Sequence, residues 1–502
     1  MKHPIFVLLF TIVSFQVFGQ SDKQEFYSKS ITSQELEEKL YTYASDEFEG
    51  RETGTKGLTI AINYLKEQYV NLEIDAAKID GNYFQNVPLK LVKTPEVSIT
   101  IEAQDYGYYK DFISISGGED FYIEAGNMVV VGYGINDDNY NDYEGIDVTG
   151  KIVVAIGGEP KGENNNYLVS GTTEISKWSN YRQELRSKQR AAKAAGAEVF
   201  FLIDDSMFNL YAPYYKSKEE SGGESNLSLD VKEEEAMYGF LVGNTMKEAL
   251  LEGAQIKIDY KEKSEPITSD NVAALIKGSE KPNEYIILSA HLDHIGIHDG
   301  EVFNGADDDG SGTVAILEIA EAFKAALKDG NGPKRSIIFL HVTGEEKGLL
   351  GSQYYTDYDP IVPLAQTVAN LNIDMIGRTD PKRLEGKRNY IYLIGSDKLS
   401  TDLHKLSEEV NSKYTNIELD YTYNDENDPN RYYYRSDHYN FAKNNIPVIF
   451  YFNGTHDDYH QASDTPDKIQ YDLLENRTRL VFHTAWELAN RDEAVRVDKV
   501  AK

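Results

Sequence analysis

The sequence predicts an α/β protein with a mostly parallel mixed sheet sandwiched by helices, and with a second, smaller domain inserted. From about residue 271 onward, short apolar runs alternate with helical segments, which is typical of buried parallel strands joined by helices. The chain has 502 residues, more than one hydrophobic core usually serves. Between residues 98 and 263, β-rich runs and polar loops replace that alternation, which indicates a separate small β-rich α+β domain.

Residues 1–19 have the pattern of a signal peptide. Lys2 precedes an apolar run from Ile5 to Val13, and small residues near Gly19 precede a polar stretch. The run is shorter than the roughly 20 residues that a membrane-spanning helix needs. We therefore expect export to a periplasm or the cell exterior, with no stable membrane insertion.

The N-terminal region after this peptide is expected to hold two helices. Ser33 is the predicted cap of the first, and the second is predicted from Gly57 to Tyr69. Within 98–263 a basic helix is expected near 182–195.

The C-terminal region supplies the strands of the predicted sheet. A helix from Thr313 to Leu327 presents an apolar face and joins the second strand to the third. The strands are predicted near 272–277, 285–290, 336–342, 367–373, 390–394 and 446–452.

Composition excludes several classes of protein. With 40% hydrophobic residues the chain is expected to be globular, and a formal net charge of −32 argues against nucleic acid as a partner. There is no cysteine, so no disulfide framework is expected.

Metal-type side chains follow four of the predicted strands. Ligands of parallel sheets bind beyond the carboxyl ends of the strands, so these positions are expected to meet. An Asp-rich turn, 304–312, lies between the first two of these strands. The side chains that follow the strands are His291 and Asp293, Glu345 and Glu346, Asp374, and His460. Each of them alone is weak evidence, but together they indicate one site.

Two imidazoles and several carboxylates suit zinc. One carboxylate can bridge two ions roughly 3.5–4 Å apart, as two-metal hydrolytic sites require. The bridge is expected in the Asp-rich turn.

The order of these motifs resembles that of the two-zinc aminopeptidases of peptidase family M28. The motifs are His-x-Asp, Asp-x-x-Ser-Gly, Glu-Glu, Asp-Met and a terminal His. The family includes leucyl aminopeptidases and aminopeptidase Y, and its relatives include glutamate carboxypeptidase II and the transferrin receptor. The resemblance implies the fold of the zinc exopeptidases, which is phosphorylase/hydrolase-like.

The resemblance also implies a role for each motif residue. Two zinc ions are expected, possible substitutes being Mn²⁺ or Co²⁺. Glu345 would be the general base, and Asp293 would orient an imidazole. His291 and Asp374 would complete one zinc site, Glu346 and His460 the other, and Asp308 would bridge the two.

A tyrosine is expected to stabilise the oxyanion. In some relatives this residue precedes the serine of the motif Ser436-Asp437-His438 by three positions, which points to Tyr433. Three consecutive tyrosines leave the register open, so Tyr434 is an alternative, and a packing role is the plainer interpretation.

Five other histidines are not expected to be ligands, because the family does not use these positions. They are His294, His298, His341, His438 and His456.

The inserted segment has the motifs Val131–Gly134, Tyr143–Val153 and Lys188–Ala197. With them it resembles a protease-associated (PA) domain, for which a role as a lid over the site and a passive structural role are both open. The predicted organisation is a signal peptide at 1–19, the first part of the peptidase domain at 20–97, the PA domain at 98–263, and the catalytic zinc peptidase domain at 264–502.

The sequence thus predicts a secreted aminopeptidase that hydrolyses the N-terminal peptide bond of peptides with a free N-terminus. The alternatives are a carboxypeptidase or dipeptidase, for which Arg378 or Arg435 could bind the substrate carboxylate, a glutaminyl cyclase, or a non-catalytic binding relative. Side-chain preference and oligomeric state are not predicted.

Overall fold

The chain forms two units, each described here by itself. The computed structural model describes residues 20–126, 128–220, 226–232 and 237–499. The first unit comprises Met1–Pro88 and Thr268–Lys502, and the second comprises Leu89–Ile267. The chain leaves and re-enters the first unit within strands β2 (Phe84–Val92) and β15 (Ser264–Ile276). The predicted signal peptide, 1–19, lies outside the described residues.

The first unit is built on a mixed sheet, which confirms the predicted fold class. Its strand order is β2-β15-β19-β16-β20-β23-β21-β22. The central strands β19, β16, β20 and β23 are mutually parallel, whereas β15 and β21 pair antiparallel to their inner neighbours. The bounds are β1 (Asp75–Ala76), which pairs with β15, β16 (Lys281–His291), β19 (Arg335–Val342), β20 (Thr367–Ile373), β21 (Tyr390–Ile394), β22 (Glu418–Asp420) and β23 (Val448–Phe452).

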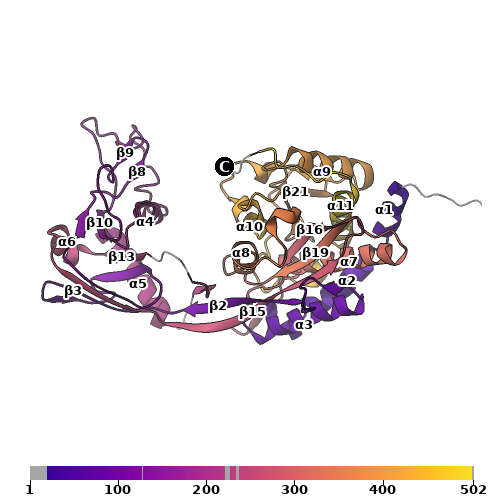
Figure 1. Cartoon of the computed structure of the whole chain (residues 1–502), viewed down its shortest axis with the longest axis horizontal. Helices are drawn as coiled ribbons and strands as arrows, with labels where there is room; N and C mark the ends of the chain where they lie inside the picture. Colours follow the sequence, from indigo (N-terminus) through magenta and orange to yellow (C-terminus); the bar gives the residue numbers. More distant parts are fainter. Residues whose placement is uncertain (1–19, 127, 221–225, 233–236, 500–502) are drawn as a thin grey trace, which may run out of the picture. The chain divides into compact units, whose positions relative to one another are not determined.

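Helices cover both faces of this sheet because successive side chains of a strand point to opposite sides. On β16, Ile286 and Leu288 pack into one core with helices α2, α7 and α11, whereas Ile287 packs into another with α8 and α10. Figure 1 shows these two groups of helices on either side of β16 and β19. The bounds are α2 (Ser33–Tyr43), α3 (Lys56–Asn71), α7 (Gly312–Lys328), α8 (Leu350–Asp357), α9 (Thr401–Tyr414), α10 (His438–Ala442) and α11 (Tyr471–Asn490).

The cap of α2 differs by one residue from the prediction. Thr32, in extended conformation, accepts a hydrogen bond from the backbone N–H of Glu35, so Thr32 and not Ser33 is the N-cap. Ser33 instead donates its hydroxyl to Glu475 on α11 and so joins the two helices.

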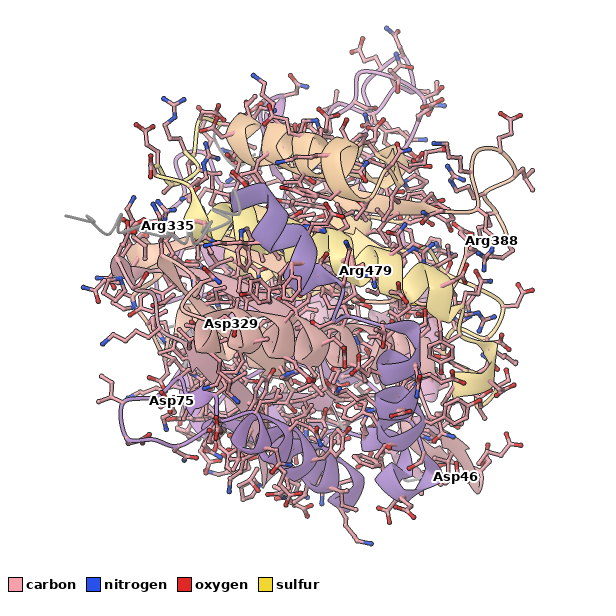
Figure 2. The ribbon with its side chains drawn as sticks, turned by 90° about the vertical axis from the view of Figure 1, so that its right-hand side faces the viewer. Asp46, Asp75, Asp329, Arg335, Arg388 and Arg479 are labelled. Carbon is pink, nitrogen blue, oxygen red and sulfur yellow. The ribbon has the colours of Figure 1, made fainter. Side chains whose placement is uncertain are left out.

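The first described helix, α1 (Gln20–Ser28), lies against α11. Figure 2 shows α1 crossing α11 beside Arg479. The Arg479 guanidinium donates to the carbonyls of Ser28 and Ile31, which fixes the end of α1 to α11.

The second unit contains two sheets around apolar cores. A five-stranded sheet has the order β5-β13-β11-β10-β7, and an antiparallel four-stranded sheet has the order β4-β3-β14-β6. Strand β12 (Asn226–Leu229) pairs with the end of β2. The other bounds are β3 (Glu96–Ile101), β4 (Gln104–Tyr106), β5 (Phe112–Ser116), β6 (Phe121–Ala125), β7 (Met128–Val130), β8 (Asn136–Asp137), β9 (Tyr140–Asn141), β10 (Ile152–Ile156), β11 (Val199–Ile203), β13 (Tyr238–Val242), β14 (Ile256–Lys261), α4 (Glu184–Ala194), α5 (Asp205–Glu220) and α6 (Asn244–Leu251).

In the described part of the chain, no helix combines the length and the apolar character that crossing a bilayer requires.

Candidate metal centre

The parallel strands bring the predicted metal-type side chains together at their carboxyl ends. His291 is the last residue of β16, and Asp374 follows β20 directly. Glu345 and Glu346 follow β19, and His460 lies in the loop after β23. Neighbouring parallel strands end at one edge of the sheet, so segments more than 160 residues apart in sequence meet there.

Asp308 lies between two imidazoles. Its Oδ1 is 3.2 Å from His291 Nε2, and its Oδ2 is 3.1 Å from His460 Nε2. The carboxylate of Asp308 is buried. This is the arrangement expected of a carboxylate shared by two ligand sets.

Each imidazole has a further carboxylate of its own. His291 Nε2 is 3.8 Å from Asp374 Oδ1, and His460 Nε2 is 3.2 Å from Glu346 Oε2. The other oxygen of Asp374 accepts a hydrogen bond of 2.6 Å from the Ser436 hydroxyl, which holds that carboxylate in place. The five predicted ligands therefore form one cluster.

The Nδ1 atom of His291 is held by the chain itself. It lies 3.0 Å from the backbone carbonyl oxygen of Asp293, so Nδ1 carries the proton and Nε2 presents its lone pair to the cluster. The sequence predicted that the Asp293 carboxylate would make this contact, but its nearer oxygen is 3.9 Å away. That carboxylate instead accepts hydrogen bonds from the Glu345 N–H and the Thr53 hydroxyl.

The cluster has the properties of a cation site. His291 Nε2, His460 Nε2 and Glu346 Oε1 are buried, and although polar atoms lie 2.9–3.2 Å away, none of the three makes a hydrogen bond of acceptable geometry within the described structure. The pKa of His460 rises to about 10: burial disfavours its charge, but contacts with Asp308 and Glu346 outweigh that effect. The surroundings thus favour positive charge, and imidazole nitrogens with carboxylate oxygens are the donors that zinc prefers.

Two compact groups of possible ligands occur here, and they include two residues that the sequence did not predict. One group contains Asp309 and the other contains His294. The Asp309 carboxylate accepts from three backbone N–H groups, those of His291, Gly312 and Met375, so its oxygens are engaged in joining the turn to the strand ends. Asp309 therefore fits a supporting position better than a ligand position.

His294 is the more informative omission. Its Nδ1 is 2.9 Å from Glu346 Oε1 and 3.9 Å from Asp308 Oδ2, and the residue is fully buried. The sequence offered only its position three residues after His291, in a turn where solvated side chains are common.

Glu345, the predicted general base, is half-buried beside the cluster. Burial raises its pKa well above the ordinary value for a glutamate, the carboxylates of Glu346 and Asp374 raise it further, and His291 opposes them.

The predicted tyrosine lies in a group of rings. Tyr433 packs edge-on against Tyr434 and His438, and burial raises its pKa to about 12. Among the described residues, the Tyr433 hydroxyl makes no hydrogen bond to any of the five clustered side chains. An oxyanion role for Tyr433 therefore stays a prediction. Tyr459, which the sequence did not single out, stacks on His460 with ring centroids 3.9 Å apart.

The turn that carries Asp308 is fixed from both sides. Gly305 has a φ of +52°, and a Cβ there would lie 2.2 Å from the carbonyl oxygen of Asp308, so only glycine fits. The buried Arg51 donates to the carbonyls of Asn304 and Gly305. Asp464 accepts from the N–H groups of Asp307 and Asp308.

The remaining histidines outside the cluster have other partners. His456 Nε2 is 3.1 Å from Asp307 Oδ2, His341 contacts the Tyr69 hydroxyl, and His298 contacts the Ile295 carbonyl. His438 stacks on Phe450.

Comparison with known proteins identifies residues 271–485 as a match to Peptidase family M28. The chain is 36% identical over 124 residues to "Aminopeptidase NAALADL1" of Mus musculus, covering 24% of this chain and 16% of that protein. It is 28% identical over 228 residues to "Leucine aminopeptidase 1" of Sclerotinia sclerotiorum, covering 44% of this chain and 56% of that protein.

Among solved structures, "Aminopeptidase from Aneurinibacillus sp. strain AM-1" is similar with a TM-score of 0.49 and 18% identity, over 95% of this chain and 98% of that one. The matched segments span about a sixth and about half of the lengths of the two sequence relatives.

Proposed function

We propose, from the premise that residues 271–485 belong to peptidase family M28, that this chain is a secreted aminopeptidase with two co-catalytic zinc ions. The observation that carries the proposal is the position of Asp308 between His291 and His460, each of which also faces a carboxylate of its own. The substrates would be peptides with a free N-terminus.

The proposed ligands divide into two sets around one shared carboxylate. His291 with Asp374 would hold one ion, Glu346 with His460 the other, and Asp308 would belong to both. When bound, such ions polarise a carbonyl oxygen and lower the pKa of water. The backbone carbonyl of Asp293 keeps the His291 lone pair directed at the cluster, and Ser436 keeps Asp374 in place.

Glu345 would transfer the proton. A carboxylate in this position takes a proton from the attacking water and returns it to the leaving amine. Its backbone N–H is hydrogen-bonded to Asp293, so the residue is tied to the segment that also positions His291. The oxyanion would be stabilised by a phenol: Tyr433 is the residue that the motif favours, and Tyr459 is the one that contacts a proposed ligand.

The wider assignments are also proposals. Residues 1–19 would direct export, and the inserted segment would be a PA domain. The second unit, Leu89–Ile267, contains the segment expected to be that domain.

The experiment compares unblocked aminoacyl-nitroanilides, their N-acetylated counterparts and peptides with a C-terminal reporter. The enzymes are wild type with zinc, wild type with chelator, and Glu345→Ala. The proposal expects hydrolysis of the free-amine substrates alone, lost in both controls. Release of C-terminal residues would indicate a carboxypeptidase, and hydrolysis of the blocked substrates would indicate an endopeptidase. Activity that survives chelation would exclude the metal mechanism.

A further inference from the structure

Arg435 lies next to the proposed metal centre. Its neighbour Ser436 donates to Asp374, and its own Nη2 donates to the Tyr459 hydroxyl at 3.4 Å. The Tyr459 ring stacks on His460. One phenol ring therefore separates the guanidinium from a proposed zinc ligand.

The Arg435 side chain is exposed and rests on an aromatic surface. Its guanidinium carbon is 5.0 Å from the centre of the Tyr432 ring, and Tyr432 itself is 5% exposed. Stacking on one ring and bonding to another phenol orients the guanidinium while leaving most of its N–H donors unused.

Two other arginines of the same unit, Arg378 and Arg383, are neutralised by carboxylates. Arg378 is 2.9 Å from Asp458 and 4.0 Å from Asp464, and Arg383 is paired with Glu418 and Asp420. Within the described residues no carboxylate of the chain forms an ion pair with Arg435. Arg378 is the other arginine that the sequence left open for carboxylate binding. Its guanidinium is already paired with carboxylates of the chain, whereas that of Arg435 is not.

The charge of the whole chain makes an exposed cation in this position informative. A formal net charge of −32 repels acidic ligands at long range, so an exposed guanidinium beside the proposed centre would favour the binding of one. A guanidinium with free donors matches the two oxygens of a carboxylate.

We propose that Arg435 binds a carboxylate of the substrate, and that the enzyme selects peptides that carry one beside the scissile bond. The inference rests on the proposed peptidase function and adds the substrate class. The carboxylate has two possible sources: the side chain of an N-terminal Glu or Asp, or the C-terminus of a dipeptide.

Two matched pairs of substrates distinguish these sources. Glu-Ala-Ala-amide and Gln-Ala-Ala-amide differ only in the first side chain, and Leu-Ala and Leu-Ala-amide differ only at the C-terminus. For wild-type enzyme loaded with zinc we expect the acidic member of one pair to have a kcat/KM about tenfold higher, mainly through KM, as one charge-assisted contact allows.

Arg435→Gln is expected to reduce that ratio to about 1 while the neutral substrates keep their kcat/KM within about twofold. Arg435→Lys retains the charge without the planar fork and is expected to be intermediate. The control is Arg431→Gln, which removes a neighbouring arginine that stacks on Tyr434 and should leave the ratio unchanged.

Wild-type ratios near 1 in both pairs would overturn the inference and leave the proposed function intact. A ratio that survives in Arg435→Gln, or an equal loss on all four substrates, would also overturn it, since Arg435 would then act on folding or not at all. If the zinc enzyme hydrolyses none of the four peptides, the proposed function fails and the inference fails with it.

Discussion

The two units of this chain differ in how their buried ionisable clusters are paired. All ten histidines of the sequence belong to the first unit, nine of them within 291–483, and His291, His294 and His460 face carboxylates without completing a hydrogen bond to them. The second unit has no histidine, and its buried ammonium, Lys188 Nζ, is satisfied by two backbone carbonyls and Glu184 at 2.7–2.8 Å.

The difference distinguishes a buried charged pair that stabilises the fold from a buried cluster that could bind a ligand. In the second unit the Lys188–Glu184 pair is complete, so it contributes to the fold and has no capacity left for a ligand. In the first unit, buried imidazole and carboxylate atoms of the cluster around Asp308 have no hydrogen-bond partner among the described residues, which is compatible with a metal site. Four predictions test this contrast.

The largest effect is expected from Glu345→Gln in the first unit. If Glu345 transfers the proton, kcat/KM should fall about 10³-fold, since removing a general acid–base group typically costs 10²–10⁴-fold. Zinc content, measured by atomic spectroscopy, should not change. Glu346→Gln is the matched comparison and should lose zinc as well as activity. A Glu345→Gln enzyme with more than a tenth of wild-type activity would contradict the proposed role.

The second prediction concerns the complete pair. Lys188→Met should destabilise the second unit by about 3 kcal/mol, because it leaves Glu184 buried without its cation. Hydrogen exchange of β10 and β11 would measure the loss, and kcat/KM should be unchanged. Lys193→Met, at an exposed position of the same helix α4, is the control and should change the unfolding free energy by less than about 0.5 kcal/mol. Equal effects of the two variants would show that the pair contributes nothing.

The third prediction is that zinc stabilises one unit only. At about a hundredfold excess over its dissociation constant, zinc should add about 2.7 kcal/mol to the protection of the strand ends around His291 and Asp374. Amides of the second unit should show no change within the same full-length sample. Asp308→Asn should abolish the difference between the units, and protection that rises equally in both would remove the contrast.

The smallest effect is expected from pH. Burial lowers the pKa of His341 to about 3, so below pH 6.5 the unfolded chain binds a proton that the folded chain does not. Stability from this residue is present above about pH 6.5 and is lost as pH falls. Between pH 6.5 and 5.5 the loss is about 1 kcal/mol. The pH dependence of wild type should exceed that of His341→Gln by this amount, as measured by exchange in β19, and parallel curves would show that His341 does not titrate as inferred.

The sequence placed the strands and the five clustered residues correctly in space because both follow from local rules. Apolar runs such as 285–290 define strands, and residues after parallel strands meet at one edge. The cluster of His291, Asp308, Glu346, Asp374 and His460 is what the structure shows, whereas their role as ligands stays a prediction.

The details that the sequence could not supply depend on side-chain directions and backbone atoms. His291 Nδ1 contacts the main-chain oxygen of Asp293. Every residue has such an oxygen, so the sequence cannot show which one makes the contact. His294 contacts Glu346 and Tyr459 stacks on His460 from turns, and the side-chain directions in a turn are not visible in periodicity. The cap at Thr32 was missed by one position for a different reason: Thr32 and Ser33 are adjacent, and both residue types can cap a helix.

The first unit is also interrupted in sequence, and this affects how the chain is made. Helices α2 and α3 and the buried Arg51 precede the second unit, whereas the carbonyls that Arg51 binds follow it. During synthesis the second unit emerges whole and can fold while it is still tethered to the ribosome. The turn that carries Asp308 finds Arg51 only after this intervening segment has been translated, and α11 arrives last of all. The residues of the inserted unit are therefore all synthesised before those of the candidate metal centre, whose last member, His460, lies near the end of the chain.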